Sequence, residues 1–198
     1  MLLDVLELRD GAVIKNELDE YNDEYEESDN GQQVLSDASL TALQSLTRVQ
    51  TFSTIYLQHI NISATGIHHL LNSYCHVAPH DTKLAHLILL KCSGNNASTV
   101  LNVARIQCIK SMKLIGCRGL FDDARIVEKF TNNIAELDNL EQLYMEDCTM
   151  MNDISMKNLS SSSSLQLIRF KNVQSYSPKS MKLFQNRITP INFVVVNK

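Results

Sequence analysis

The sequence predicts an α/β fold built as a solenoid, with about seven parallel strands on a concave face and helices on the convex face. Two observations predict it. A short phrase of spaced apolar residues recurs seven times along the chain, and most copies are followed by a segment whose apolar residues have helical spacing. Because strands of one direction that are joined through helices form a parallel sheet, stacked copies are expected to build a curved horseshoe.

The repeated phrase is apolar-x-x-apolar-x-apolar-x-x-cysteine or apolar. Successive copies start 49, 32, 25, 31, 25 and 26 residues apart, and all intervals but the first fit a strand, a helix and two loops. Side chains alternate faces along a strand, so the fourth and sixth residues of each phrase are expected in the core. In the last copy these are Val194 and Val196. The copies start at Leu3, Phe52, Leu84, Ile109, Leu140, Leu165 and Ile191.

Five segments between the predicted strands have the features of amphipathic helices. Each begins with a capping or first-turn residue and then carries apolar residues three or four apart. The run of serines from Ser160 to Ser164 is expected to be a surface loop between a helix and a strand. The predicted helices cover 36–43, 63–71, 122–130, 152–159 and 177–184.

Three copies of the phrase end in cysteine, at Cys92, Cys117 and Cys148, whereas Ile60 and Val173 stand at that position in two others. With these cysteines, the units resemble the cysteine-containing and ribonuclease-inhibitor-like leucine-rich repeats of many F-box proteins. The resemblance covers nearly the whole chain and implies a horseshoe that binds a protein. It also implies a thiol turned inward beneath the strand end, within reach of loop backbone groups. Recognition of substrates for an F-box-type ubiquitin ligase is one role that it suggests.

A chain of 198 residues can bury one self-sufficient core, so a single domain over 1–198 is expected. A flexible acidic insertion at about 15–33 lengthens the first interval. Its segment Glu17 to Asp29 holds eight acids and no base, and outside that segment 14 acids stand against 18 bases. We interpret the insertion as a solvated loop; the alternative is an acidic, aromatic contact for a basic partner.

The sequence does not favour catalysis, a cofactor or a metal site. It carries no phosphate loop and no nucleophile motif, and its clustered histidines fit no zinc finger. The five cysteines are odd in number and form no C-x-x-C pair, which is typical of reduced thiols in the cytoplasm or nucleus. An export signal and a membrane-spanning apolar run are both lacking. A weakly basic body does not favour nucleic-acid binding.

The chain begins inside a predicted strand, so another region or a partner is expected to cover Leu3 to Leu8.

The strand register also predicts which side chains project from the concave sheet. The first predicted column is Glu7, Tyr56, Ile88, Lys113, Tyr144, Arg169 and Val195. The second is Arg9, Gln58, Leu90, Ile115, Glu146, Lys171 and Asn197. The third is Val5, Thr54, His86, Ser111, Gln142, Leu167 and Phe193.

The centre of these columns is interpreted as a protein-binding site with an apolar middle and a polar margin. The alternative is that its apolar residues only favour strand formation or lie under a terminal segment. Two functions remain open: a recognition module, or an inhibitor or assembly factor that caps an enzyme or complex subunit. The predicted site residues are Tyr56, His86, Ile88, Leu90, Lys113, Ile115, Tyr144, Glu146, Arg169 and Lys171.

Overall fold

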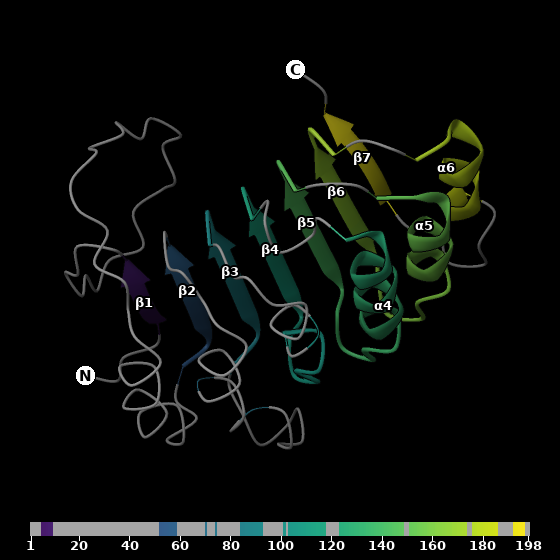
Figure 1. Cartoon of the computed structure of the whole chain (residues 1–198). Coiled ribbons are helices and arrows are strands. Elements are labelled where there is room, and N and C mark those ends of the chain that lie inside the picture. The colour runs from purple at the N-terminus through teal and green to yellow at the C-terminus, as the bar shows by residue number, and fades with distance from the viewer. Residues whose placement is uncertain are drawn as a thin grey trace.

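The computed structural model describes residues 5–9, 52–58, 70, 74, 84–92, 101, 103–117, 123–148, 151–173, 176–185 and 192–196. Within these residues the chain forms one all-parallel sheet and three helices (Figure 1). The predicted helix over 36–43, nearly all of the one over 63–71, and the acidic insertion lie outside the described residues, as does Ile60.

The sheet contains seven strands of five residues each, and their order in the sheet is their order in the sequence. Figure 1 shows β1 at one end of the sheet and β7 at the other. The prediction of an α/β fold with parallel strands at these seven places is confirmed. The strands are β1 (Val5–Arg9), β2 (Thr54–Gln58), β3 (His86–Leu90), β4 (Ser111–Ile115), β5 (Gln142–Glu146), β6 (Leu167–Lys171) and β7 (Asn192–Val196).

The core side of the sheet is a set of apolar rows that run across the strands. Leu89, Leu114 and Met145 occupy paired positions on β3, β4 and β5, and each is at most 1% exposed. Leu87 and Met112 belong to a second buried row beside them. Burying side chains of this size stabilises a fold by about 1.5–3 kcal/mol each. Because every row crosses several strands, neighbouring units stabilise one another.

Three helices lie on the core side of the sheet: α4 (Ala124–Ala135), α5 (Asp153–Ser160) and α6 (Pro178–Gln185). All three confirm predicted helices, and α4 runs five residues beyond the predicted end at 130. Asp123 caps α4 by accepting a hydrogen bond from the Arg125 backbone N–H at 2.8 Å, and Asn152 caps α5 through the N–H of Ser155. These caps satisfy backbone groups that the first helical turn leaves open.

Polar side chains join α4 to α5. Asn158 donates a 3.0 Å hydrogen bond to the backbone carbonyl of Glu128, while Asn152 donates to the Glu128 carboxylate at 2.7 Å. The apolar face of α4, with Val127, Phe130 and Ile134 buried, packs into the core. The helices are therefore fixed both by burial and by side chains that bond from one helix to the next.

The same turn follows four strands. Gly116 has a φ of 63°, and the residue after β3, β5 and β6 also has a positive φ: Lys91, Asp147 and Asn172. Each of these N–H groups donates to the last carbonyl of the next strand, as from Gly116 to Glu146 at 2.7 Å. Left-handed backbone costs little for glycine, aspartate and asparagine and more for lysine. The turn directs the following residue back beneath the sheet.

The predicted register of β7 is wrong by one residue. Ile168 pairs with Phe193, and Arg169 pairs with Val194, whose side chain is 40% exposed. Val194 therefore lies in the outward row, and Asn192 and Val196 flank it there in place of the predicted Phe193 and Asn197. The alternation of apolar and polar residues is lost where Phe193 is followed by three valines, so the pattern alone cannot select one of two faces.

The serine run is only partly a surface loop. Ser160 ends α5, and Ser161 and Ser163 are exposed, as predicted. Ser162 is fully buried and accepts a hydrogen bond from the backbone N–H of Leu165 at 3.2 Å. Ser164 donates to the carbonyl of Leu137. Ser162 thus orders the loop internally, and Ser164 ties it to the preceding unit.

Candidate protein-binding face

The candidate site is the sheet face opposite α4, α5 and α6. Residues at alternate strand positions, such as Leu114, join helix residues such as Phe130 in one core cluster. The positions between them point to the other side, in three rows that cross the strands. For β1 to β6 the pairing matches the three predicted columns.

All ten predicted site residues occupy these outward positions, but they differ in exposure. His86, Lys113 and Arg169 are exposed. Five others are partly buried, namely Leu90, Ile115, Tyr144, Glu146 and Lys171. The remaining two, Tyr56 on β2 and Ile88 on β3, are buried.

Tyr56 and Ile88 are 3% and 9% exposed, although neither belongs to the core cluster. The Tyr56 hydroxyl donates to Gln58 Oε1 at 3.1 Å, and Gln58 is itself buried. The expected apolar centre over β2 and β3 is therefore not an accessible surface in this structure. An alternating pattern assigns a side chain to one side of a sheet, but it does not show what covers that side. The accessible part of the face extends from His86 and Leu90, at the two ends of β3, to β7.

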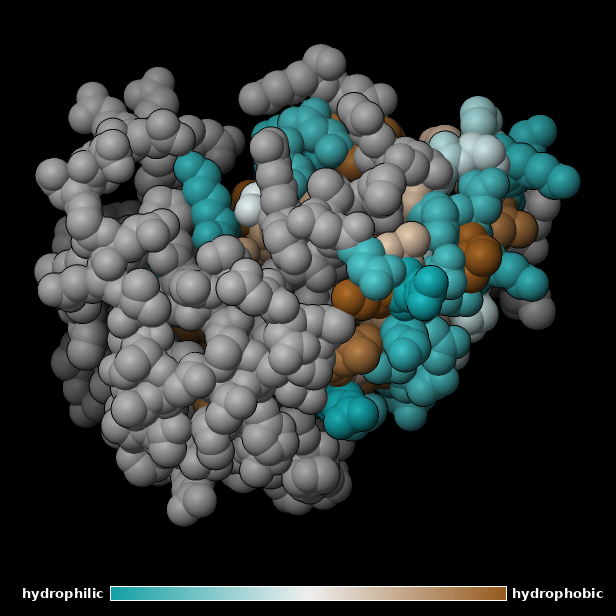
Figure 2. Space-filling view, in the orientation of Figure 1, coloured by the Kyte–Doolittle hydropathy of each residue, from teal (hydrophilic) through white to brown (hydrophobic). Residues whose placement is uncertain are grey.

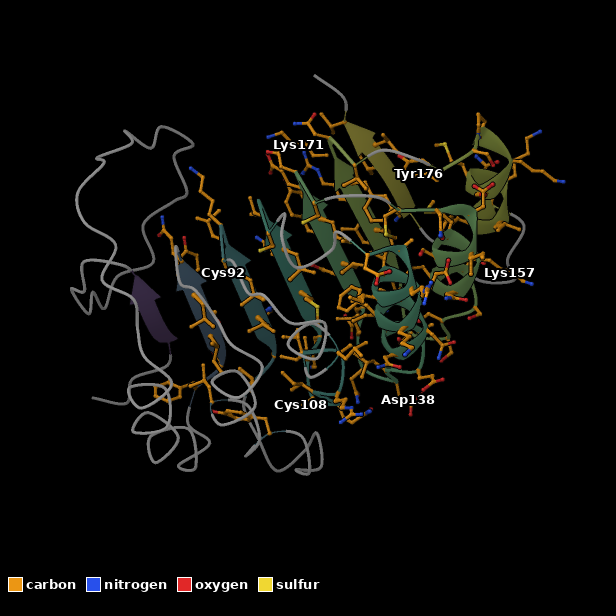
Figure 3. All side chains as sticks on the ribbon, in the orientation of Figure 1. Cys92, Cys108, Asp138, Lys157, Lys171 and Tyr176 are labelled. Carbon is orange, nitrogen blue, oxygen red and sulfur yellow. The ribbon has the colours of Figure 1, made fainter. Side chains whose placement is uncertain are left out.

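Four side chains of β5 and β6 form one connected cluster, which we call the Tyr144 cluster: Tyr144, Glu146, Arg169 and Lys171. The Tyr144 hydroxyl donates to Glu146 Oε2, and the Lys171 ammonium contacts Glu146 Oε1 at 2.6 Å. The Arg169 guanidinium lies over the Tyr144 ring, 5.6 Å from its centroid. Figure 3 shows Lys171 at the upper end of its strand. These contacts hold long side chains in defined positions.

Basic groups outnumber acidic ones on this face. From β2 to β7 the outward rows contain Lys113, Arg169 and Lys171 but only one carboxylate, that of Glu146. The pKa of His86 is held below its ordinary value of 6.5, first by desolvation and then by the positive charges of Lys113 and Lys110. The rows thus carry a local excess of two positive charges.

The three cysteines at the strand ends are structural. Cys92, Cys117 and Cys148 are buried, and each thiol lies 3.3–3.4 Å from a carbonyl of the preceding strand. Their partners are strand carbonyls rather than the expected loop groups. Burial raises the pKa of Cys117 to about 11 and also raises that of Cys148. Because a thiolate is the reactive form, these thiols are poor nucleophiles and poor metal ligands in the folded state.

The helix side of the molecule has a different character. Figure 2 shows hydrophilic residues there, with hydrophobic ones lying singly between them. Ile154 on α5 and Leu183 on α6 are the large exposed apolar side chains of that side among the described residues. Scattered apolar residues are ordinary on protein surfaces.

The described residues contain no group of three His, Cys, Asp or Glu side chains arranged to hold a metal ion. The other five histidines and Cys75 lie outside them. In the described part of the chain, none of the helices has the length and apolar character needed to cross a membrane.

No protein-family model matches the chain, and a search of curated proteins found no match either.

Sequence reasoning missed two features of the face. The repeated phrase predicts Val194 in the core because the valine run hides the register, and only the pairing with Arg169 places it on the outward row. The second is the hydrogen bond between Tyr144 and Glu146. Its signal in the sequence is that β2 carries Tyr56 and Gln58 at the same two positions, where the structure shows the corresponding hydrogen bond.

Proposed function

We propose that the chain is a leucine-rich-repeat horseshoe that binds a protein partner on its concave sheet and does no chemistry itself. The single domain, its place in the cytoplasm or nucleus and the absence of a cofactor belong to this proposal. The observation that supports it most directly is the Tyr144 cluster. Tyr144 and Arg169 of this cluster belong to a row of outward side chains that crosses β4 to β7.

Repetition supports the horseshoe. The same strand pairing, left-handed turn and inward thiol recur from one unit to the next, as at Gly116 and Cys117 and again at Asp147 and Cys148. An architecture of this kind is stabilised by contacts between neighbours and presents a broad curved face. A face of several adjacent strands suits a protein better than a small molecule, which needs an enclosing pocket.

The composition of the face supports recognition. Tyrosine and arginine are the residues that most often dominate binding energy at protein interfaces. Here Arg169 is held over Tyr144. Ile115 pairs with Glu146 of the same cluster, and Leu90 pairs with Ile115, so these two residues provide apolar surface on the same face. Side chains that are ordered before binding lose less conformational entropy when the partner arrives.

Two roles fit such a module. The first is substrate recognition for an F-box-type ubiquitin ligase, and the second is an inhibitor or assembly factor that caps an enzyme or complex subunit. Copurification distinguishes them. A cullin-ligase adaptor, bound through an additional region, would favour the first role, whereas one stoichiometric target would favour the second.

Affinity capture with matched variants tests the proposal. Ile115→Ala combined with Tyr144→Ala removes apolar contact surface from the concave face without changing its charge. Ile154→Ala combined with Leu183→Ala removes similar surface from the helices. We expect partner recovery, quantified by mass spectrometry, to fall at least about tenfold for the concave pair and to stay unchanged for the helix pair. Equal recovery with both pairs would rule out the concave face as the binding site.

A further inference from the structure

We propose that the edge of β7 that faces away from β6 is a second interaction surface, which pairs in antiparallel fashion with the β7 of a second copy of this chain. The inference goes beyond the proposed function and does not depend on it. It is carried by the backbone groups on that edge, by the half-open end of the core beside it, and by the sequence of the strand.

Two residues of β7 direct their backbone groups away from β6. Asn192 donates its N–H to the carbonyl of Gln166, just before β6, at 2.8 Å, so the backbone groups of Asn192 face β6. Successive residues of a strand direct these groups to opposite sides, and those of Phe193 and Val195 therefore face the other way. Within the described residues no strand pairs with that side, because β7 stands at the end of the sheet (Figure 1). Such an edge is a template for pairing with another chain.

One of the buried rows of the core ends half-open at β7. Met145 and Phe170 of this row are fully buried and occupy paired positions on β5 and β6. Val195 pairs with Phe170 and continues the row, but its side chain is only partly buried. The interface that joins each unit to the next is thus continuous up to the edge of β7. A further strand at this edge would extend that interface and bury Val195 more completely.

The sequence of β7 is complementary to itself. When two such strands run antiparallel with Val194 opposite the Val194 of the second copy, Phe193 of each copy stands opposite Val195 of the other. These are the residues whose backbone groups face the edge, so each opposite pair exchanges two hydrogen bonds. Val195 of each copy remains on the core side, and the two Val194 side chains meet on the outward side. The same patch is used by both copies, so the contact closes at a dimer.

The charge of the strand also favours a second copy. Proteins prevent edge-to-edge pairing with charged side chains or proline, and the five residues of β7 include neither. The strand at the other end of the sheet, β1, carries Glu7 and Arg9. The corresponding centred pairing of two β1 strands would place Glu7 opposite Glu7, and like charges directly opposite one another destabilise a sheet. We therefore assign the self-pairing edge to β7.

A dimer of this kind joins two concave faces into one sheet. The outward row that contains Arg169 and Val194 continues directly into the same row of the second copy. The two Arg169 positions are then three strand spacings apart, or about 14 Å. This exceeds the screening length of about 8 Å at physiological ionic strength, so their repulsion does not oppose dimer formation strongly. Both candidate binding faces lie on the same side of the joined sheet.

Analytical ultracentrifugation of the full chain tests the pairing through charges at its centre. We expect the wild type to form a dimer of twice 22.4 kDa, with a dissociation constant in the micromolar range because the contact is small. Val194→Lys and Val194→Glu each place like charges opposite one another and should weaken the dimer at least about fivefold. An equal mixture of the two variants should restore it to within about twofold of the wild type. Ile154→Lys, at a position on α5 that is 54% exposed, is the control and should change the dissociation constant less than about twofold.

Disulfide trapping tests the register without introducing a charge. The two Val194 residues form a pair without mutual hydrogen bonds, in which Cα atoms lie about 4.5 Å apart, within the range of about 4.4–6.8 Å that a disulfide spans. Val194→Cys should therefore give a covalent dimer with oxidised glutathione as the oxidant. Ile154→Cys, equally accessible but far from the edge of the sheet, should not. The wild type, with its own five cysteines, gives the background.

Four results would overturn the inference. The first is a wild-type mass that stays at 22.4 kDa up to submillimolar concentration. The second is undiminished dimer formation by both charged variants, and the third is crosslinking of Val194→Cys no faster than that of Ile154→Cys. The fourth is growth beyond the dimer as concentration rises, because it indicates head-to-tail pairing of β7 with the β1 of another copy. Capture of a protein partner is measured separately, so its outcome leaves this inference unchanged.

Discussion

The thiol of Cys117 lies 3.4 Å from the backbone carbonyl of Leu89, one strand back in the sheet. Cys92 and Cys148 make the same contact with Leu57 and Leu114. A buried thiol is a weak donor with the size of a small apolar side chain. Each cysteine therefore combines core packing with a hydrogen bond that links two neighbouring strands.

Substitution of Cys117 separates these two contributions. Cys117→Val fills the space of the thiol with a slightly larger apolar side chain and removes the donor, so a loss of about 1 kcal/mol in the free energy of unfolding is expected. Cys117→Ala also leaves a cavity and should cost about 2 kcal/mol. Urea unfolding followed by circular dichroism measures both. Val173, buried at the matching place of the next-to-last unit, shows that valine fits there. A larger loss for valine than for alanine would contradict this account.

Alkaline pH should destabilise the fold through Cys117. Its pKa is raised from 9.0 to about 11 in the folded protein, because burial disfavours the thiolate. The unfolded state therefore releases its proton first, and the stabilisation present below pH 9 is lost as the pH rises toward 11. Raising the pKa of this thiol from 9.0 to about 11 corresponds to about 2–3 kcal/mol in the free energy of unfolding. Urea midpoints should fall across this range, and Cys117→Val should flatten the slope relative to wild type.

A charge in a buried row should unfold more than its own unit. Leu143 is 1% exposed and pairs with Met112 on one side and Ile168 on the other. Leu143→Asp would bury a carboxylate among them, at a cost above about 3 kcal/mol. Hydrogen exchange should show lost protection in β4, β5 and β6 together. Protection lost in β5 alone would contradict the coupling between neighbours.

The corrected register of β7 makes opposite predictions for adjacent valines. Val194 is 40% exposed on the outward row, so Val194→Lys should change the free energy of unfolding by less than about 0.5 kcal/mol. Val195 pairs with the fully buried Phe170, so Val195→Lys should destabilise by more than about 1 kcal/mol. Thermal unfolding of the two variants compares them. The reverse order would restore the register expected from sequence.

The pKa of His86 is sensitive to the positive charge of the lysines near it. Lys113→Gln removes one of the two positive charges that lower the pKa of His86, so this pKa should rise toward its ordinary value. An NMR titration of the imidazole protons measures it. Lys157→Gln, on α5, is the control and should leave the titration unchanged. If the pKa stays the same in both variants, the lysine charge does not contribute.

The positions of the strands, their parallel direction and most of the register follow from the order of apolar residues along the chain. Alternating apolar residues such as Leu87 and Leu89 bury only if they point to one side, and the recurring phrase repeats that requirement in each unit. The capping residues Asp123 and Asn152 marked where helices begin.

Which outward residues are accessible, and how they are linked, depends on contacts between segments that are far apart in the chain. Periodicity describes one strand at a time, whereas the burial of Tyr56 and Ile88 depends on what lies over the sheet. The contact between Glu146 and Lys171 likewise depends on a neighbouring strand. In β7 the run of valines satisfied either register, and hydrogen bonding to β6 selected the one that exposes Val194.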